Sequence, residues 1–288
     1  MRNRPMKKPN RTIKWILLAP VILILSCTDL TENVNNQVTA ENFFKTDEEF
    51  ISALGDAYGA LTQYGGNFAV NMLAEVPSDE IVVGHKGADW EDGGMWIRLH
   101  RQNFQPSEDV IVNTWNEFYN GIAIANRLIF QFETVVESGD VSQEDANAFI
   151  AELRALRAFY YYNLLDNYGN VPIVTDFQQD PATTAQPSRD FDEGRAAVFE
   201  FVEQELLEVL PLVDDNVAAT IGRVNKWVVH MTLAKLYLNA EVYVGISRWE
   251  DVITHTDAII DSNNYSLTGN YFDNFSVQNT GSPEHIFT

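Results

Sequence analysis

The residues best suited to chemistry in this 288-residue sequence lie in segment 84–104, which contains several glycines and two tryptophans. Sugar rings present flat apolar C–H faces and rims of hydroxyl groups. Their capture therefore requires aromatic side chains for stacking and planar side chains for hydrogen bonding. Trp90 and Trp96 have the first property, and four charged residues have the second: Asp89, Asp92, Arg98 and Arg101. The segment predicts a ligand-binding loop on a more rigid scaffold.

The same residues also fit structural roles. Trp96 has Met95 and Ile97 beside it, which favours a place in a hydrophobic core for Trp96 and a structural role for Arg98. Trp90 is flanked by acidic residues, and for this side chain ligand contact and packing are equally open. A Trp90→Ala substitution is therefore the direct test of the predicted site.

Patterns typical of enzymes do not point to catalysis. The histidines are not spaced as in the HExxH zinc motif, and the sequence has no GxSxG, P-loop or GxGxxG pattern. A glycosidase needs only two carboxylates that face a cleft, but 41 acidic residues produce such pairs by chance. The best pair is Asp79 and Glu80, and adjacent residues of an extended segment point to opposite faces. We predict no enzymatic activity, no metal site and no cofactor.

The first 26 residues have the pattern of a secretion signal. Six basic residues precede an apolar run, 15–25, that is too short to cross a bilayer. The run leads to Cys27, the only cysteine of the chain, in the sequence LILSC. This resembles a bacterial lipobox, which implies cleavage before Cys27 and lipid attachment through its sulfur. We expect residues 1–26 to be a lipoprotein signal peptide and 27–40 a polar tether; a simple signal peptide or a short membrane anchor is the alternative.

The charge of the chain excludes some partners. Residues 1–26 hold six of the 19 basic residues and none of the 41 acidic ones, so their removal changes the net charge from −22 to −28. A field of this sign repels nucleic acid and anionic lipid headgroups. A DNA- or RNA-binding function is therefore excluded, and attachment to a membrane must come from the lipid on Cys27.

Helical periodicity dominates the rest of the sequence, residues 41–288. Apolar residues recur at intervals of three and four in ranges that begin and end at capping residues, glycine or proline. The most informative helix carries two apolar stripes (Leu153, Leu156, Tyr160 and Leu164; Ala155, Phe159 and Tyr162), so it must be covered on two sides. Gly169 and Pro172 end it. The predicted helices are 46–64, 110–137, 142–168, 191–210, 225–244 and 248–260, with 84–108 as a long loop.

These helices are predicted to form antiparallel pairs. Small residues at Ala234 and Ala240, with the larger Tyr237 and Trp249, resemble the tetratricopeptide pattern, although generic helix packing produces similar spacing. The predicted fold is all-α, a tetratricopeptide-like superhelical scaffold with long loops and few short strands. The segment SPEHIFT, 282–288, has the pattern of the start of a strand.

Several blocks resemble the SusD/RagB family of surface lipoproteins, which capture nutrients at outer membranes of the Bacteroidetes type. They occur in the family's order: 75–80 (EVPSDE), 89–101, 115–127, 152–174 and 222–224. The resemblance implies a cell-surface protein, anchored in the outer membrane, that delivers an oligosaccharide to a SusC-like TonB-dependent transporter without catalysis. Proteins of this family are considerably longer, so the resemblance also implies an N-terminal portion. The alternatives are a lipidated helical-repeat scaffold for protein interactions and a peptide-uptake member of the family.

Overall fold

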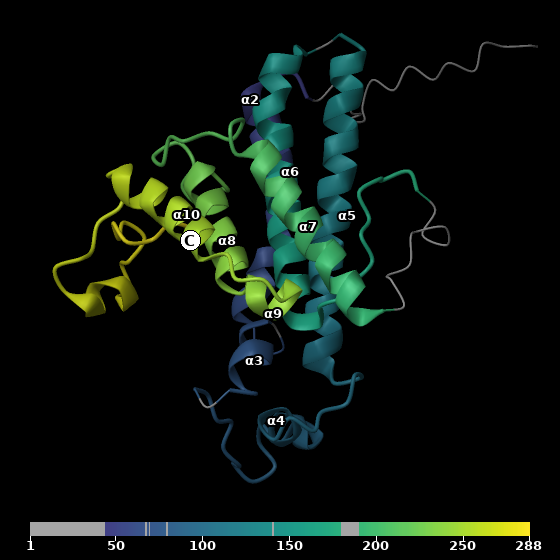
Figure 1. Ribbon diagram of the computed structural model, residues 1–288, viewed down its shortest axis with the longest axis vertical. Coiled ribbons are helices and arrows are strands. Elements are labelled where there is room, and N and C mark those ends of the chain that lie inside the picture. The colour runs from purple at the N-terminus through teal and green to yellow at the C-terminus, as the bar shows by residue number, and fades with distance from the viewer. Residues whose placement is uncertain (1–43, 67, 69, 79, 140, 180–189) are drawn as a thin grey trace, which may run out of the picture. The chain divides into compact units, whose positions relative to one another are not determined.

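The computed structural model describes residues 44–66, 68, 70–78, 80–139, 141–179 and 190–288 (Figure 1). The chain divides into two units, Met1–Thr39 and Ala40–Thr288, and every described residue belongs to the second. The predicted signal peptide, Cys27, the tether and Asp79 lie outside the described residues. Among the described residues, no helix is both long enough and apolar enough to span a bilayer.

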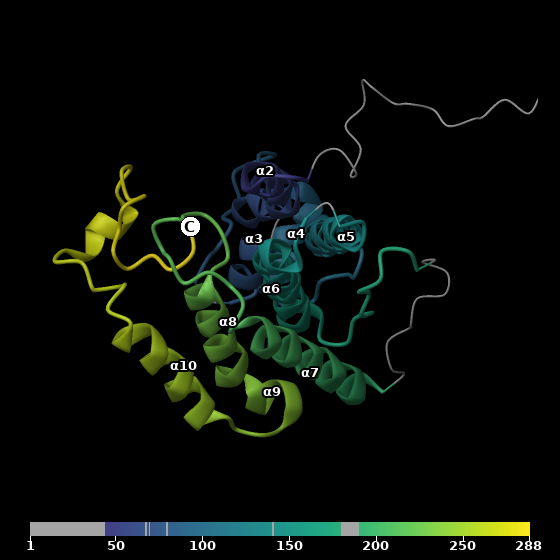
Figure 2. The same cartoon turned by 90° about the horizontal axis from the view of Figure 1, so that it is seen from above.

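Three long helices form the centre of the second unit: α5 (Asp109–Glu137), α6 (Gln143–Tyr168) and α7 (Phe191–Val209). α6 lies beside both α5 and α7, and consecutive helices run in opposite directions (Figures 1 and 2). The predicted two-sided burial of α6 is confirmed, because Leu153, Leu156 and Tyr160 are inaccessible to solvent and the second stripe is buried or half-buried. Full burial of an apolar side chain contributes about 1.5–3 kcal/mol. These three helices are called the helical core below.

Two glycines allow α6 to take this position. A Cβ on Gly121 of α5 would lie 2.6 Å from Cε2 of Tyr160, so the two helices approach each other where α5 has no side chain. Gly169 ends α6 as predicted, with φ of +72°, and its N–H donates to the carbonyl of Leu165 at 2.9 Å.

The first described helix, α2 (Asp47–Tyr58), is capped by Thr46, the first residue of the predicted helix 46–64. The Thr46 hydroxyl accepts from the N–H of Glu49, and the Glu49 carboxylate accepts from the N–H of Thr46 at 3.0 Å. The chain continues as a 3₁₀ helix, η1 (Gly59–Gly65), so the predicted end near residue 64 is correct for the combined helical segment. The Tyr160 hydroxyl donates to the carbonyl of Ala57 at 2.6 Å and ties α2 to α6.

The C-terminal half of the unit contains α8 (Lys226–Leu238), α9 (Ala240–Val244), α10 (Trp249–Asp261) and the 3₁₀ helix η4 (Tyr271–Phe275), with α8 packed along α10. The predicted single helix 225–244 is wrong, because it breaks at Asn239, whose ψ of 9° is not helical. The N–H of Asn239 closes the end of α8, and its carbonyl accepts from Val242 and Tyr243 in α9. Asparagine suits such a break because its short polar side chain tolerates non-helical backbone.

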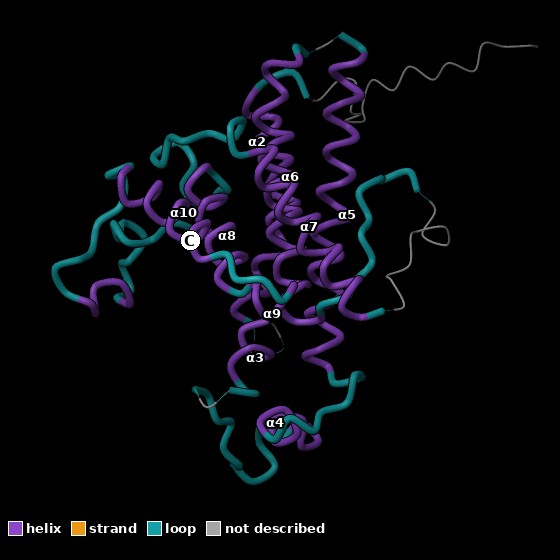
Figure 3. The backbone as a smooth tube through the Cα atoms, in the orientation of Figure 1, coloured by secondary structure: helices purple, strands orange, loops and turns teal. Residues whose placement is uncertain are grey.

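The predicted long loop 84–108 contains helical turns that the sequence analysis missed. η2 (Asp92–Gly94) leads into α4 (Met95–His100), and α3 (Val70–Glu75) precedes them. Two turns of helix are too short to establish a period, and Gly93-Gly94 at the start conceals the signal. No strand occurs in the parts of the chain that are drawn as described (Figure 3); one isolated bridge joins Lys86 and Asp89, and residues 282–288 are irregular rather than extended in a sheet.

Candidate functional site

The segment around α4 has a small hydrophobic core of its own. Its buried members are Val76, Met95, Trp96, Leu99 and Val110. They form a cluster separate from the main hydrophobic cluster of the long helices, although Val110 lies in the first turn of α5. We call this group, with the turns that surround it, the loop cluster (residues 76–110). Two consecutive left-handed glycines, Gly93 and Gly94, bend the chain into α4 and place Trp96 inward.

Three of the predicted site residues hold this segment together. Trp96 is 2 % exposed, and its indole N–H donates to the carboxylate of Asp92 at 2.5 Å. Arg98 donates to both carboxylate oxygens of Glu108, at 2.6 and 2.7 Å, and to the carbonyl of Gly93 at 2.7 Å. Hydrogen bonding to Arg98 lowers the pKa of Glu108, so this carboxylate is charged at neutral pH. The side chains of Trp96 and Arg98 are thus engaged within the protein.

The other three predicted residues face solvent. Trp90 is 47 % exposed, and its backbone has a φ of +59°, which is uncommon for a residue with a side chain. Strained backbone of this kind concentrates at functional sites. The ammonium group of Lys86 lies 5.5 Å from the centre of the Trp90 ring, which leaves an indole with an adjacent cation at the surface. Asp89 and Arg101 are exposed on either side of this turn in the sequence.

The structure therefore separates the predicted residues by their contacts, with Asp92 exposed but bonded to Trp96. Asp92, Trp96 and Arg98 shape the loop, whereas Trp90, Asp89 and Arg101 remain available to a ligand. Sequence reasoning missed Lys86, although a cation four residues from an exposed tryptophan in a turn is a usable signal. It also missed Glu108, the partner that fixes Arg98.

A cavity of about 740 Å³ lies elsewhere, between η1, α6, α8 and residues 284–288. Its surface is mainly apolar and aromatic, and the ring of Phe287 packs edge-on against Phe159 at 5.7 Å. The hydroxyl of Tyr64 is already engaged by Asn163 at 2.8 Å. Sequence reasoning missed this cavity because its walls come from four segments that are far apart in the chain.

Two buried histidines join α8 to α10. Nδ1 of His230 lies 2.8 Å from Nδ1 of His255, and the ring of Tyr237 stacks on His255. Burial, with the nearby His255 and Lys226, lowers the pKa of His230 to about 4; burial also lowers the pKa of His255. In the described part of the chain, no group of three or more His, Cys, Asp or Glu side chains is placed to hold a metal ion.

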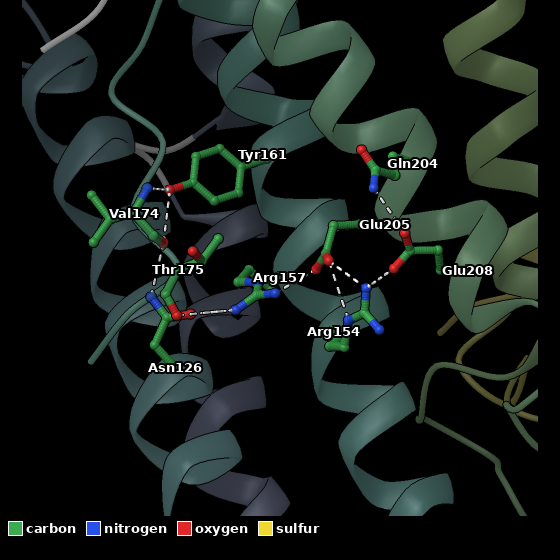
Figure 4. A network of polar contacts seen from close by, with 9 residues as sticks. All are labelled: Asn126, Arg154, Arg157, Tyr161, Val174, Thr175, Gln204, Glu205 and Glu208. Carbon is green, nitrogen blue, oxygen red and sulfur yellow. Dashed lines mark hydrogen bonds and ion pairs between the residues drawn. The ribbon is translucent and has the colours of Figure 1, made fainter. Parts of the chain in front are cut away.

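A polar network crosses the helical core (Figure 4). Arg157 of α6 is 5 % exposed and donates to Glu205 of α7 at 2.5 Å and to Asn126 of α5 at 2.7 Å. Arg154 donates to the same glutamate at 2.6 Å and to Glu208 at 2.5 Å. The sequence favours Asn126 and Arg154 as hydrogen-bonding groups that tie helices together rather than as ligand contacts, and in the structure both connect helices.

The comparisons with known proteins agree with this architecture. Residues 32–238 match the family model SusD-like_3, described as "Starch-binding associating with outer membrane". SusD-like protein P38 from Formosa agariphila is 25 % identical over 274 residues, which are 92 % of this chain and 48 % of that protein. The chain thus spans about half the length of this curated relative.

Solved structures show the same fold. Surface glycan-binding protein A from Bacteroides uniformis aligns with a TM-score of 0.67 at 24 % identity, over 84 % of this chain and 52 % of that one. Surface glycan-binding protein A from Bacteroides thetaiotaomicron, solved in complex with laminarihexaose, aligns with a TM-score of 0.65 at 23 % identity, over 84 % and 48 %. The predicted all-α, tetratricopeptide-like fold is confirmed.

Proposed function

Because this chain belongs to the SusD-like family, described as starch-binding and associating with the outer membrane, we propose that it is a non-catalytic glycan-binding lipoprotein. The observation that carries the proposal is the exposed indole of Trp90, held on a structured turn with a cation beside it. The exposed part of this indole would stack on the C–H face of a sugar ring, with the Lys86 ammonium over the ring and with Asp89 and Arg101 as exposed hydrogen-bonding groups. The names of two aligned structures, which refer to glycan and laminarihexaose, support this ligand class.

The proposal includes the route of the glycan. A lipid on Cys27 would attach the protein to the outer membrane, on the outer face of the cell, and a SusC-like TonB-dependent transporter would receive the ligand. The support for this part is the lipobox-like sequence around Cys27, the strongly acidic mature chain and the family's stated association with the outer membrane.

Calorimetric titration tests the binding site. With laminarihexaose and maltohexaose as probes, we expect heat from at least one of them, and Trp90→Ala should lower its affinity at least tenfold, or about 1.4 kcal/mol. Trp249→Ala is the matched control, because Trp249 is 50 % exposed and lies on α10, outside the loop cluster. Equal affinity of wild type and both variants would exclude the loop. Heat from peptides but not from the sugars would favour peptide uptake. Absence of heat with both sugars and peptides would favour a protein-interaction scaffold.

Fractionation tests the anchor. Cys27→Ala should move the protein from the membrane fraction to the soluble fraction of its native host, since a single chemical group is removed. Ser26→Ala, which keeps a small residue before the cysteine, should leave it in the membrane. Membrane retention of Cys27→Ala would contradict lipid attachment at this residue.

A further inference from the structure

A groove of about 460 Å³ opens between α5, α6 and α7, beside the polar network of Figure 4. This volume lies within the range of small-molecule sites, about 300–1,000 Å³. From the residues that line the groove, we propose that it binds a single neutral sugar ring, as a second site separate from the loop cluster. The inference rests on the proposed glycan-binding function.

Each of the three helices contributes one apolar side chain to the groove. Phe201 of α7 is half-buried and lines the groove together with Ile129 of α5 and Ile150 of α6. The ring of Phe201 meets that of Tyr161 at 5.0 Å and 78°, a contact that holds its orientation. An oriented aromatic ring, with two aliphatic side chains in the same groove, matches the apolar face of a pyranose.

The same three helices also supply hydrogen-bonding groups, three or four residues after each apolar side chain and so on the same helix faces. Gln204 is exposed, and Arg154 keeps 24 % of its side chain in contact with solvent although it is bonded to Glu205 and Glu208. Both side chains line the groove, as does the exposed Glu133 of α5. Planar donors and a carboxylate acceptor are the groups that bind vicinal hydroxyls.

The charge of the groove favours a neutral ligand over an anionic one. Glu205 accepts from both Arg154 and Arg157, and Glu208 accepts from Arg154, so the two guanidinium groups are balanced within the protein. The lining itself carries two positive charges (Arg154 and Arg157) and two negative charges (Glu133 and Glu205). Glu208, bonded to Arg154 outside the lining, leaves the site with one negative charge in excess. A uronic acid or a phosphorylated sugar would be repelled, whereas a neutral ring is not.

Arginine side-chain NMR tests the site directly. Glucose is the probe and glucuronate its charged counterpart; a single ring should bind with a Kd on the order of millimolar. The Nε–H signals of Arg154 and Arg157 should shift on addition of glucose and stay in place with glucuronate. Nε of Arg157 is buried without a hydrogen-bond partner among the described residues, so its signal reports on movement of the network.

Two variants of groove residues test the proposed sugar site independently of the NMR signals. Phe201→Leu removes the flat ring but keeps an apolar side chain, and should lower glucose affinity at least fivefold. Gln204→Ala changes an exposed position that cannot unfold the core, and should lower it at least twofold. Gln278→Ala, at an exposed glutamine outside the groove, should have no effect. Static arginine signals, equal shifts with glucuronate, or wild-type affinity in both groove variants would each overturn the proposal.

The same spectra separate this inference from the loop site. In a titration with laminarihexaose and maltohexaose, the indole N–H of Trp90 reports on the loop cluster and the arginine signals on the groove. Indole shifts without arginine shifts would overturn the groove and leave the proposed function standing. Arginine shifts without indole shifts would support the groove and exclude the loop. No shift with either oligosaccharide or with glucose would overturn both.

Discussion

The helical core and the loop cluster each contain an arginine–glutamate ion pair, but the two pairs have different structural roles. In the helical core, Arg157 and Glu205 keep 6 % and 10 % of their side chains exposed, and they join α6 to α7. In the loop cluster, Arg98 keeps 35 % exposed, and it joins α4 to a residue ten positions away in the chain. The first ion pair aligns long helices; the second stabilises a turn that presents Trp90 to solvent.

This difference indicates where the protein tolerates change. Charges buried in the helical core have been removed from water, so each depends on its partner for stability. The loop cluster is held by a few contacts around one tryptophan, and its outer side chains are not needed for packing. Recognition can therefore vary at the outer face of the loop cluster while the helical core stays the same.

The largest expected effect is in the helical core. Glu205→Ala should lower the free energy of unfolding by about 3–5 kcal/mol, because it leaves Arg157 buried without its carboxylate. Urea denaturation measures the change. Asp56→Ala removes the partner of Arg127, an exposed pair with 38 % and 67 % of the side chains accessible, and should cost less than about 1 kcal/mol. Similar losses in the two variants would contradict the distinction between buried and exposed pairs.

A loss of folding stability of intermediate size is expected at acid pH. The pKa of His230 falls to about 4 in the folded protein from an ordinary value of 6.5, so the unfolded chain binds more protons between these values. Stability should fall by about 2 kcal/mol as the pH drops from 6.5 to 4, after allowance for partial solvent contact of the ring. In His230→Gln this part of the pH dependence should be absent, whereas the exposed His100→Gln should follow the wild-type curve. Parallel curves for wild type and His230→Gln would contradict the assignment.

The loop cluster should respond to acid in a different window. The pKa of Glu108 lies below its ordinary value of 4.5, so its stabilising contribution is present above that value and is lost as the pH falls further. The protection factors of the α4 amides, which compare exchange with the intrinsic rate at the same pH, should therefore fall only below about pH 4.5, after the α8–α10 pair has begun to weaken.

The sequence predicted most of the helices well because their signals are local. Two apolar stripes require two neighbours, and Thr46 and Gly169 mark helix ends by their own chemistry. Asn239 carries a weaker signal, since asparagine also occurs within helices, and the break between α8 and α9 was missed. The helix α4 was missed because it is too short for periodicity to emerge.

The site was harder to predict because it depends on contacts between distant residues. Tryptophans and charges indicated the segment of the predicted site, and the neighbours of Trp96 indicated that Trp96 is buried and Arg98 structural. The sequence does not show the contacts that divide the inward residues from the exposed ones. That division depends on the pairing of Arg98 with Glu108 and on the core that forms around Trp96. The groove beside Phe201 requires three helices to be placed first, so no single stretch of sequence reveals it.

Trp96→Ala should have the smallest effect on global stability, and it compares the loop cluster with the helical core most directly. Removing a buried tryptophan normally costs about 3–5 kcal/mol, but Trp96 packs in a cluster separate from the helical core. We expect the free energy of global unfolding to change by less than about 1 kcal/mol, while amides 95–100 lose protection against hydrogen exchange. Trp90→Ala, at the exposed position, should leave that protection unchanged. If Trp96→Ala instead lowered the stability of α5 and α6 by its full expected cost, the loop cluster would be an integral part of the helical core, and ligand contacts at Trp90 would then be coupled to the packing of the long helices.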